Sequence, residues 1–364
     1  MRKLASIRRI AEIKPIEGAD AIEAVRVDGW WCVAKKGEFQ LNDLCVYFEI
    51  DSFLPVRPEF EFLRKNCFKS TQHLGDGFRL RTVKLRGQVS QGLALPLSNF
   101  PKEFVKEYKL WLYNNFDEST SIAIDICPIP VGEGDDVTEL LGVKKWEMPI
   151  PAQLAGQIKG DFPSFIRKTD QERAQNLFEE YQEKYKDEPF EATVKLDGSS
   201  MTVYWNNGQF GVCSRNLDLK ETENNTYWRV ARESGLEGIL SKLGRNVALQ
   251  GELMGPGIQG NRENLKKHEF FLFDIWNIDE QRYLDPAERY TFKTDMNEIS
   301  FAELWEVPYI GVVKPFRYTL EELLEMADKT ESLTNSVAEG IVFKGINVPV
   351  SFKIISNKFL LGEK

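Results

Sequence analysis

Short runs of alternating apolar and polar residues follow one another through the first 127 residues of the chain. They predict strands at Leu4–Ile13, Ala21–Val27, Trp30–Ala34, Leu44–Phe48, Phe78–Leu85 and Gln91–Pro96. Turn sequences separate these runs, and Asp28-Gly29 between two of them is a strong hairpin signal. Evenly spaced short strands are typical of a small barrel or sandwich. We therefore expect residues 1–127 to form a five-stranded β-barrel of the OB type.

The pattern changes after residues 128–155, which contain Pro128-Ile-Pro-Val-Gly-Glu-Gly134 and Met148-Pro-Ile-Pro151 and so have the composition of a linker. Thr169 and Glu172 form a capping box ahead of apolar residues at helical spacing, which predicts a helix to about Lys186. A second capped helix is expected to begin at Thr319. Strands are expected at Ala192–Leu196, Met201–Trp205, Val247–Gln250 and Phe270–Trp276. Residues 156–364 are thus expected to form a second domain of mixed helix and strand, which makes the chain an α+β protein.

Size and composition limit the class of protein. A chain of 364 residues exceeds what one hydrophobic core usually serves, so two domains are the default. The chain has no apolar run of membrane-spanning length, and its start has no signal-peptide core. Five scattered cysteines without a C-x-x-C pair favour free thiols in a reducing cytoplasm and disfavour a zinc site. The net charge of −9 argues against bulk electrostatic binding of nucleic acid, although a local basic surface could still bind it.

Lys195-Leu-Asp197-Gly198 follows the β-prone run that begins at Ala192. A lysine at such a position is costly unless it is paired, because burial disfavours its charged form. The same effect makes lysine a usable nucleophile, since burial or neighbouring cations lower its pKa. By itself, the group reads equally well as a strand-end lysine before an Asp-Gly turn.

Further short motifs follow this group in a fixed order along the chain. Glu252 and Glu339 each lie beside a glycine at the end or start of an apolar run, and two such carboxylates suit hydrated Mg²⁺. Phe271 and Phe273 alternate, so both rings face one side of a strand, where they either pack in the core or stack on a nucleotide base. Lys353 is a lone cation in an apolar run and needs an anion such as phosphate.

A basic cluster lies in the N-terminal part of the chain, where Arg79 and Arg81 share a strand face by the two-residue period and Lys84 and Arg86 follow them. Two interpretations of this cluster stay open. It is either a solvated edge strand that charge protects from aggregation, or a surface that binds the RNA backbone.

The ordered set of motifs resembles the ATP-dependent RNA ligases, specifically the group in the covalent nucleotidyltransferase superfamily with an N-terminal OB domain and a C-terminal nucleotidyltransferase domain. The resemblance extends over essentially the whole chain. It implies that the second domain is an adenylyltransferase domain, ATP-grasp-like, of antiparallel sheets with flanking helices. It also implies ATP as a substrate, with Mg²⁺ or Mn²⁺, and a reaction that joins RNA 3′-hydroxyl and 5′-phosphate ends.

The resemblance assigns roles to individual residues. Lys195 matches the nucleophile that becomes lysyl-AMP, and Asp197 and Gly198 complete its motif, with Asp197 near the water shell of the metal. Glu252 matches the acidic residue bonded to the ribose or to metal waters, and Glu339 the second acidic residue of the metal shell. Phe273 matches the ring that stacks on adenine, and Lys353 the lysine on the α-phosphate. Arg215, with Asn216 beside it in Ser-Arg-Asn, matches the contact to the ribose and the reacting RNA 3′ end.

Two departures from the family pattern bear on these assignments. Ile355 stands where many ligases have a second lysine, which leaves Lys358 as a weak replacement. The chain also ends eleven residues after Lys353, which leaves no room for the C-terminal OB domain of DNA ligases and capping enzymes. A DNA ligase or capping guanylyltransferase is the nearer alternative, and an RNA-binding OB adaptor with an inactive transferase domain is the more distant one. The expected partner is RNA, in nicked or broken duplexes, with neither a membrane nor an obligate protein partner.

Overall fold

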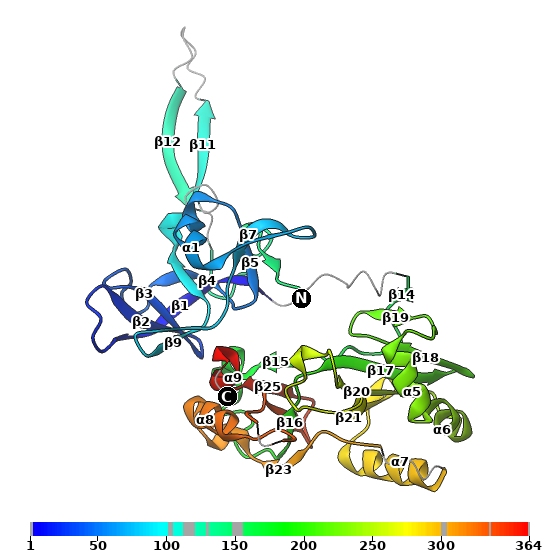
Figure 1. The fold of residues 1–364 in the computed structure, drawn as a ribbon. Coiled ribbons are helices and arrows are strands. Elements are labelled where there is room, and N and C mark those ends of the chain that lie inside the picture. The colour runs from blue at the N-terminus through cyan, green and yellow to red at the C-terminus, as the bar shows by residue number, and fades with distance from the viewer. Residues whose placement is uncertain are drawn as a thin grey trace. The chain divides into compact units, whose positions relative to one another are not determined.

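The fold is taken from a computed structural model that describes residues 3–100, 105–111, 121–128, 131–147, 156–299, 304–334 and 336–362. The chain divides into two units, Met1–Pro149 and Ile150–Lys364 (Figure 1). Cys32, Cys45, Cys67 and Cys213 are free thiols. No helix among the described residues is long and apolar enough to cross a membrane.

The first unit is built on a five-stranded antiparallel sheet that forms an OB-like half-barrel, where the sequence predicts a five-stranded barrel of the OB type. In sheet order, its strands are β10 (Leu93–Pro96), β4 (Leu44–Phe48), β1 (Ala5–Pro15), β2 (Ile22–Val27) and β3 (Trp30–Lys35). The hairpin predicted at Asp28-Gly29 is confirmed, because Val27 pairs directly with Trp30 and Asp28 adopts a φ of 48°. Strand β3 alternates buried and less buried positions, as the period of two requires.

A second, four-stranded sheet covers one face of the first. Its order is β13 (Lys144–Lys145), β5 (Ser52–Pro55), β7 (Gly75–Arg79) and β6 (Phe68–Thr71). Pro58–Leu63 forms the 3₁₀ turn η1, which continues into the short helix α1 (Arg64–Cys67), and a further 3₁₀ turn, η2, spans Leu97–Asn99. The apolar core includes Ile7 and Phe48 from the first sheet and Phe78 from the second.

Residues 131–147 pack on this unit, although the sequence places them in a linker. Val137 donates a backbone hydrogen bond to Ala5, and Trp146 donates one to Asp51. Val137 and Leu141 are buried in the core of the unit. The first unit therefore extends well beyond residue 127, and the remainder of the expected linker, residues 129–130 and 148–155, lies outside the described residues.

Two hairpins belong to neither of these sheets. One pairs β8 (Val83–Leu85) with β9 (Gln88–Ser90), and the other pairs β11 (Val105–Trp111) with β12 (Ser121–Pro128). The β11–β12 hairpin projects from the rest of the unit in Figure 1. The prediction of a single strand over Phe78–Leu85 is wrong, because β7 ends at Arg79 and β8 begins at Val83. Arg79 thus belongs to the four-stranded sheet, whereas Lys84 and Arg86 belong to the β8–β9 hairpin.

The second unit contains two sheets. A seven-stranded antiparallel sheet has the order β14 (Ile158–Asp161), β19 (Leu217–Leu219), β18 (Gln209–Cys213), β17 (Ser199–Asn206), β20 (Val247–Met254), β21 (Glu269–Asn277) and β22 (Arg282–Tyr283). A five-stranded sheet has the order β15 (Glu172–Arg173), β25 (Ser351–Ile355), β24 (Gly340–Gly345), β16 (Phe190–Lys195) and β23 (Tyr309–Val313), with β15 parallel to β25.

Helices cover one face of each sheet. The helices are α4 (Phe178–Tyr181), α5 (Thr226–Glu233), α6 (Leu236–Leu243), α7 (Pro286–Ile299), α8 (Leu320–Lys329) and α9 (Asn357–Leu361), with 3₁₀ turns η3 (Ala174–Asn176), η4 (Gln259–Asn261) and η5 (Pro315–Arg317). The core under α5, α6 and α7 contains Leu249 and Phe292, and the core under α8 contains Phe343 and Leu323. A third cluster joins the two sheets, since it includes Val194 of β16 and Phe271 of β21.

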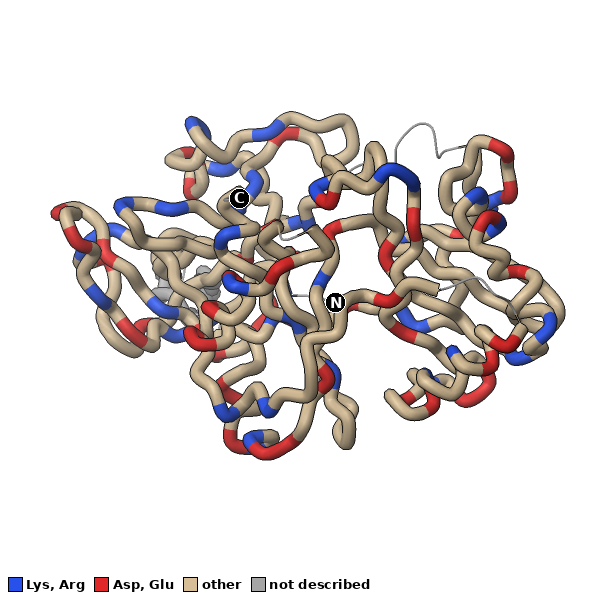
Figure 2. Tube along the Cα trace, turned by 60° about the horizontal axis from the view of Figure 1, so that its bottom comes forward, with Lys and Arg blue, Asp and Glu red and all other residues tan. Residues whose placement is uncertain are grey.

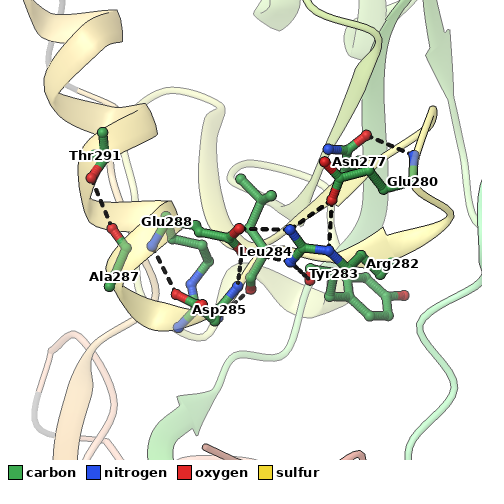
Figure 3. Close-up of polar contacts among 10 residues, drawn as sticks. Asn277, Glu280, Arg282, Tyr283, Leu284, Asp285, Ala287, Glu288 and Thr291 are labelled. Carbon is green, nitrogen blue, oxygen red and sulfur yellow. Dashed lines mark hydrogen bonds and ion pairs between the residues drawn. The ribbon is translucent and has the colours of Figure 1, made fainter.

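The start of α7 is closed by a reciprocal cap (Figure 3). The Glu288 amide donates to the Asp285 carboxylate at 2.8 Å, and the Asp285 amide donates to Glu288 Oε2 at 2.8 Å. Arg282 donates to both Glu280 and Glu288, and its hydrogen bonds to Glu288 lower the pKa of that carboxyl to about 2. The cap satisfies backbone donors that a helix N-terminus leaves without partners.

One of the two helices predicted from capping boxes is present. Thr319 and Glu322 form the complete box at the start of α8. The prediction of a helix from Thr169 to Lys186 is wrong. Glu172 and Arg173 form strand β15, and the rest of this segment contains only the short elements η3 and α4. The parallel pairing with β25, contributed by the other end of the unit, outweighs the local helix signal. Its expected apolar face, including Phe178 and Tyr181, still packs in the core under α8.

Candidate active site

Lys195 is the last residue of β16 and lies opposite Gly340 of β24. Glu339 immediately precedes β24, so the antiparallel register brings its carboxylate to the lysine. Lys195 Nζ donates to Glu339 Oε2 at 2.6 Å, and the two side chains are 25% and 18% exposed. The structure therefore joins two residues that are 144 positions apart and that the sequence had singled out separately.

Carboxylates surround the ammonium of Lys195. Burial lowers the pKa of Lys195, but Glu339, Glu252 and Asp197 together raise it above the ordinary lysine value. Burial raises the pKa of Glu252 to about 7, against the attraction of Lys195, and burial together with Glu339 raises the pKa of Asp197 to about 6. The site thus holds more negative charge than one lysine balances.

Gly198 is required by the close approach of β20 to the turn after Lys195. A Cβ at this position would lie 2.6 Å from the carbonyl oxygen of Leu253 and 2.7 Å from Cγ of Glu252. Because glycine has no Cβ, the Gly198 amide can approach Glu252 and donates to its Oε1 at 3.1 Å. The glycine therefore connects the turn after Lys195 to the carboxylate of the other sheet.

Lys353 lies on the same face of the five-stranded sheet as Lys195. Lys353 pairs with Val342 of β24, which pairs with Thr193 of β16, two residues before Lys195. Burial, helped by Lys195 and by Arg173, lowers the pKa of Lys353 to about 8. No ion pair joins its ammonium to another side chain in the described part of the chain. A cation in this position is suited to an anionic ligand.

Arg173 is a site residue that the sequence analysis missed. It is the parallel-register partner of Lys353 and is only 7% exposed. Lys358, the weak candidate for a second phosphate-binding lysine, is exposed on α9, and its backbone amide donates to Asp328. The structure therefore favours Arg173 as the second cation. The only sequence signal was an arginine inside the supposed helix, which a solvated helix face explains equally well.

The two alternating phenylalanines share one cluster, as the sequence predicts. Phe271 is buried, whereas Phe273 is partly buried against the same cluster, which also contains Leu196 next to the predicted nucleophile. Phe273 falls at a bulge in β21, since Leu272 pairs with Gly251 and Asp274 pairs with Gln250. Phe271 is thus the core residue, and Phe273 is the ring that stays available to a ligand.

Arg215 and Asn216 are both bonded to the segment before β15. Arg215 Nη2 donates to Asp170 Oδ1 at 2.6 Å, and Lys168 Nζ donates to Asn216 Oδ1 at 3.1 Å. The Arg215 and Asp170 side chains are exposed. Asp170 also acts electrostatically on Lys353, so this exposed pair lies within reach of the buried cations.

The basic residues predicted to bind RNA in the first unit lie in different environments. Arg79 is half-buried, with its guanidinium 4.8 Å from the Trp146 ring centroid and 3.8 Å from Asp51. Arg81, Lys84 and Arg86 are exposed. Basic and acidic positions are interspersed over both units (Figure 2), so any nucleic-acid surface must be local.

The carboxylates near Lys195 fit a hydrated metal ion better than a directly bound one. Within the described ranges, no three His, Cys, Asp or Glu side chains lie close enough to hold a metal ion directly. Asp197, Glu252 and Glu339 nevertheless act together on Lys195, and the raised pKa values of Asp197 and Glu252 indicate uncompensated negative charge. Mg²⁺ usually keeps several of its waters, so carboxylates at this spacing suit it.

Comparisons with known proteins identify the family of the chain. A family model described as an OB-fold domain matches residues 4–97, and one described as RNA ligase matches residues 188–355. A Naegleria gruberi RNA ligase mutant solved with AMP and Mn is 46% identical, with a TM-score of 0.85 over 99% of this chain and 98% of that chain. Another mutant of that ligase, solved with ATP and Mn, is 45% identical, with a TM-score of 0.86 over the same shares. The same ligase with PPi is 46% identical, with a TM-score of 0.84 over 99% and 98% of the two chains. No curated protein matches the chain.

An OB-like sheet followed by a two-sheet domain with a strand-end lysine defines a covalent nucleotidyltransferase. Identity of 46% over essentially the whole chain shows that the protein belongs to the RNA ligase family.

Proposed function

We propose that the protein seals RNA 3′-hydroxyl and 5′-phosphate ends with ATP, through lysyl-AMP on Lys195 and an adenylylated RNA 5′ end. The observation that carries this proposal is the placement of Lys195 among Asp197, Glu252 and Glu339, with Lys353 on the same sheet face. The Naegleria ligase has been solved with ATP, AMP, Mn and PPi, which are a substrate, a product group, a metal and a leaving group of such a reaction.

In the first step, Lys195 Nζ attacks the α-phosphorus of ATP. A phosphorus–nitrogen bond forms, the bond from the α-phosphorus to the bridging oxygen breaks, and pyrophosphate leaves. The amine must first lose a proton, yet the carboxylates around it raise the pKa of Lys195. Glu339, already hydrogen-bonded to Nζ, is placed to orient the lone pair once the proton has left.

Asp197, Glu252 and Glu339 would hold Mg²⁺ or Mn²⁺, mainly through its waters. When bound, the ion supplies positive charge that offsets the carboxylates, favours the neutral amine and stabilises charge on the transferring phosphoryl group. Glu252 is also tied to the turn after Lys195 by the Gly198 amide, so the metal-binding carboxylate and the nucleophile keep a fixed relation.

Lys353 and Arg173 would bind the phosphates of ATP. Neighbouring cations on a single sheet face stabilise the charge that spreads over the phosphoryl oxygens. Phe273 would stack on the adenine. Arg215 and Asn216 would exchange their contacts with Asp170 and Lys168 for the ribose and the RNA 3′ end.

In the next two steps, AMP passes from Lys195 to the RNA 5′-phosphate, and the 3′-hydroxyl of the other end then attacks that phosphate and releases AMP. Each step is an in-line displacement at phosphorus, where positioning and charge stabilisation provide most of the catalysis. Arg81, Lys84 and Arg86 of the first unit would hold the RNA backbone, and repair of nicked or broken duplexes in the cytoplasm would be the setting.

A sealing assay with defined ends tests this proposal. RNA strands that carry a 5′-phosphate and a 3′-hydroxyl should be joined with ATP and Mg²⁺, in the nicked duplex faster than as free strands. Strands with a 5′-hydroxyl and a 3′-phosphate should not be joined, because AMP then has no acceptor. A DNA ligase would seal an all-DNA nick at least as fast, and an inactive adaptor would bind RNA without sealing it.

A further inference from the structure

A buried ion pair lies behind the Phe273 ring and joins the two sheets of the second unit. Lys344 of β24 and Asp274 of β21 are paired at 2.9 Å, with side chains that are 14% and 5% exposed. The ammonium of Lys344 lies 5.6 Å from the Phe273 ring centroid. Because β24 also follows Glu339 directly, this pair connects the strand of the catalytic carboxylate to the strand of the ring.

The bulge in β21 explains why a cation is needed at this point. The register places Phe273 between Leu272 and Asp274, which pair with Gly251 and Gln250, so Phe273 is the extra residue of the bulge. A bulged residue is left out of the ladder, and bulges next to active sites re-aim a side chain. The carbonyl oxygen of Phe273 accepts instead from Lys344 Nζ at 2.6 Å. The Lys344 ammonium therefore takes the place of a backbone donor from the neighbouring strand. It does so at Phe273, the residue whose ring faces the site.

A second ion pair close by offers a comparison. Glu191 lies directly opposite Lys344 in the sheet and pairs with Arg289 of α7. Both of these side chains are also largely buried, at 15% and 13% exposed. Arg289 lies 3.9 Å from Asp274, but its hydrogen bonds within the described part of the chain go to Glu191 and Leu284 and not to the Phe273 carbonyl.

We infer that Lys344 is a positioning residue for the nucleotide base: paired with Asp274, it fixes the bulged carbonyl of Phe273 and so the plane of the stacking ring. This inference rests on the proposed role of Phe273 against adenine. Without the ammonium, the carbonyl loses this charged donor and the bulge can relax, so the ring is no longer held ready. The loss appears in ATP binding rather than in the chemical step, because Lys344 touches no reacting atom.

The test is the rate of lysyl-AMP formation against ATP concentration in the full chain. Lys344→Met should raise the ATP concentration for half-saturation roughly tenfold, as expected for the loss of a charge-assisted hydrogen bond, with the saturating rate within about twofold. Glu191→Gln weakens the neighbouring ion pair but keeps the Lys344 donor to the Phe273 carbonyl, so it should leave the ATP concentration for half-saturation near the wild-type value. An equal rise in both variants would overturn the inference.

A charge-balanced double variant separates positioning from folding. Lys344→Met alone leaves Asp274 buried without its lysine, whereas Lys344→Met/Asp274→Asn removes both charges and should recover most of the lost thermal stability. The ATP concentration for half-saturation should stay raised in the double variant, because the Phe273 carbonyl still lacks its donor. Recovery of both stability and half-saturation would show that only charge balance matters, and the inference would be wrong.

Phe273→Leu distinguishes failure of the inference from failure of the proposed role of the ring. This variant should raise half-saturation, and adding Lys344→Met should add little, because both changes act through the same ring. If Phe273→Leu raises half-saturation while Lys344→Met does not, the ring keeps its role and the inference fails. If Phe273→Leu has no effect, the proposed role of Phe273 fails and the inference falls with it.

Discussion

At the scale of single residues, the pKa values of two lysines on the same face of the five-stranded sheet are shifted in opposite directions. The three carboxylates around Lys195 raise the pKa of this lysine. Burial, with Lys195 and Arg173, lowers the pKa of Lys353 to about 8. The first lysine must lose its proton to react, whereas the second must keep its proton to bind phosphate.

This difference predicts how ATP binding depends on pH. Lys353 is charged below about pH 8 and neutral above it, so phosphate binding should weaken as pH rises through that value. An ATP analogue with a methylene bridge between the α- and β-phosphates, which cannot release pyrophosphate, should bind several-fold more weakly at pH 9 than at pH 7 at saturating Mg²⁺. Lys353→Arg keeps its charge in this range and should remove most of the dependence. An unchanged dependence in that variant would assign the titration to another group.

The two glutamates should matter for chemistry more than for folding. Glu252→Ala and Glu339→Ala should each lower the rate of lysyl-AMP formation by roughly 10²–10³-fold, because they support charge at the transferring phosphoryl group. Lys353→Ala should have a comparable effect, and Phe273→Leu a smaller one. Single-turnover rates at saturating ATP measure these losses. If Phe273→Leu proved more damaging than Lys353→Ala, the roles of ring and cation would be reversed.

At the scale of elements, α8 shows a helix whose start depends on local chemistry. Thr319 accepts from the Glu322 amide, and Glu322 accepts from the Thr319 amide. Thr319→Ala should therefore cost about 1 kcal/mol of unfolding free energy, or a melting temperature lower by about 2–4 °C, with unchanged sealing activity. Thr294→Ala on α7 serves as the control, because this hydroxyl donates to the carbonyl of Tyr290 one turn before and caps no helix end. The control variant should keep the wild-type melting temperature. Equal losses in both variants would show that the cap contributes nothing.

Local signals were enough for some elements and not for others. The hairpin at Asp28-Gly29 and the start of α8 are present as the sequence predicts, since each depends on residues close in the chain. The strand at Leu44–Phe48 is also present, because its own residues favour an extended chain. The prediction of a helix from Thr169 failed because Glu172 and Arg173 pair with Phe352 and Lys353, 180 residues further along the chain. The same distant pairing hid Arg173 from the site prediction, whereas Lys195, Glu252 and Glu339 were found because each lies in a short motif.

At the scale of the whole molecule, the first unit is the candidate RNA-holding part, and its basic residues should not be equivalent. Replacing the exposed Arg81, Lys84 and Arg86 with alanine should weaken RNA binding and lower the slope of log affinity against log salt by about 2–3, as fewer counterions are released. Arg79→Ala should instead destabilise the unit through its lost contacts with Trp146 and Asp51, with little change in that slope. Titrations of a nicked duplex at several salt concentrations measure both effects. A triple variant with an unchanged slope would mean that the cluster protects an edge from aggregation.

The account as a whole depends on Lys195 as the nucleophile that carries AMP. Incubation of the full chain with Mg²⁺ and either α-labelled ATP or α-labelled GTP, followed by a denaturing gel, tests this directly. We predict a labelled protein band with ATP and not with GTP, and no band for Lys195→Met, which loses only the nucleophilic nitrogen while the fold and ATP binding are kept. A labelled band from Lys195→Met, or from GTP in preference to ATP, would contradict the account.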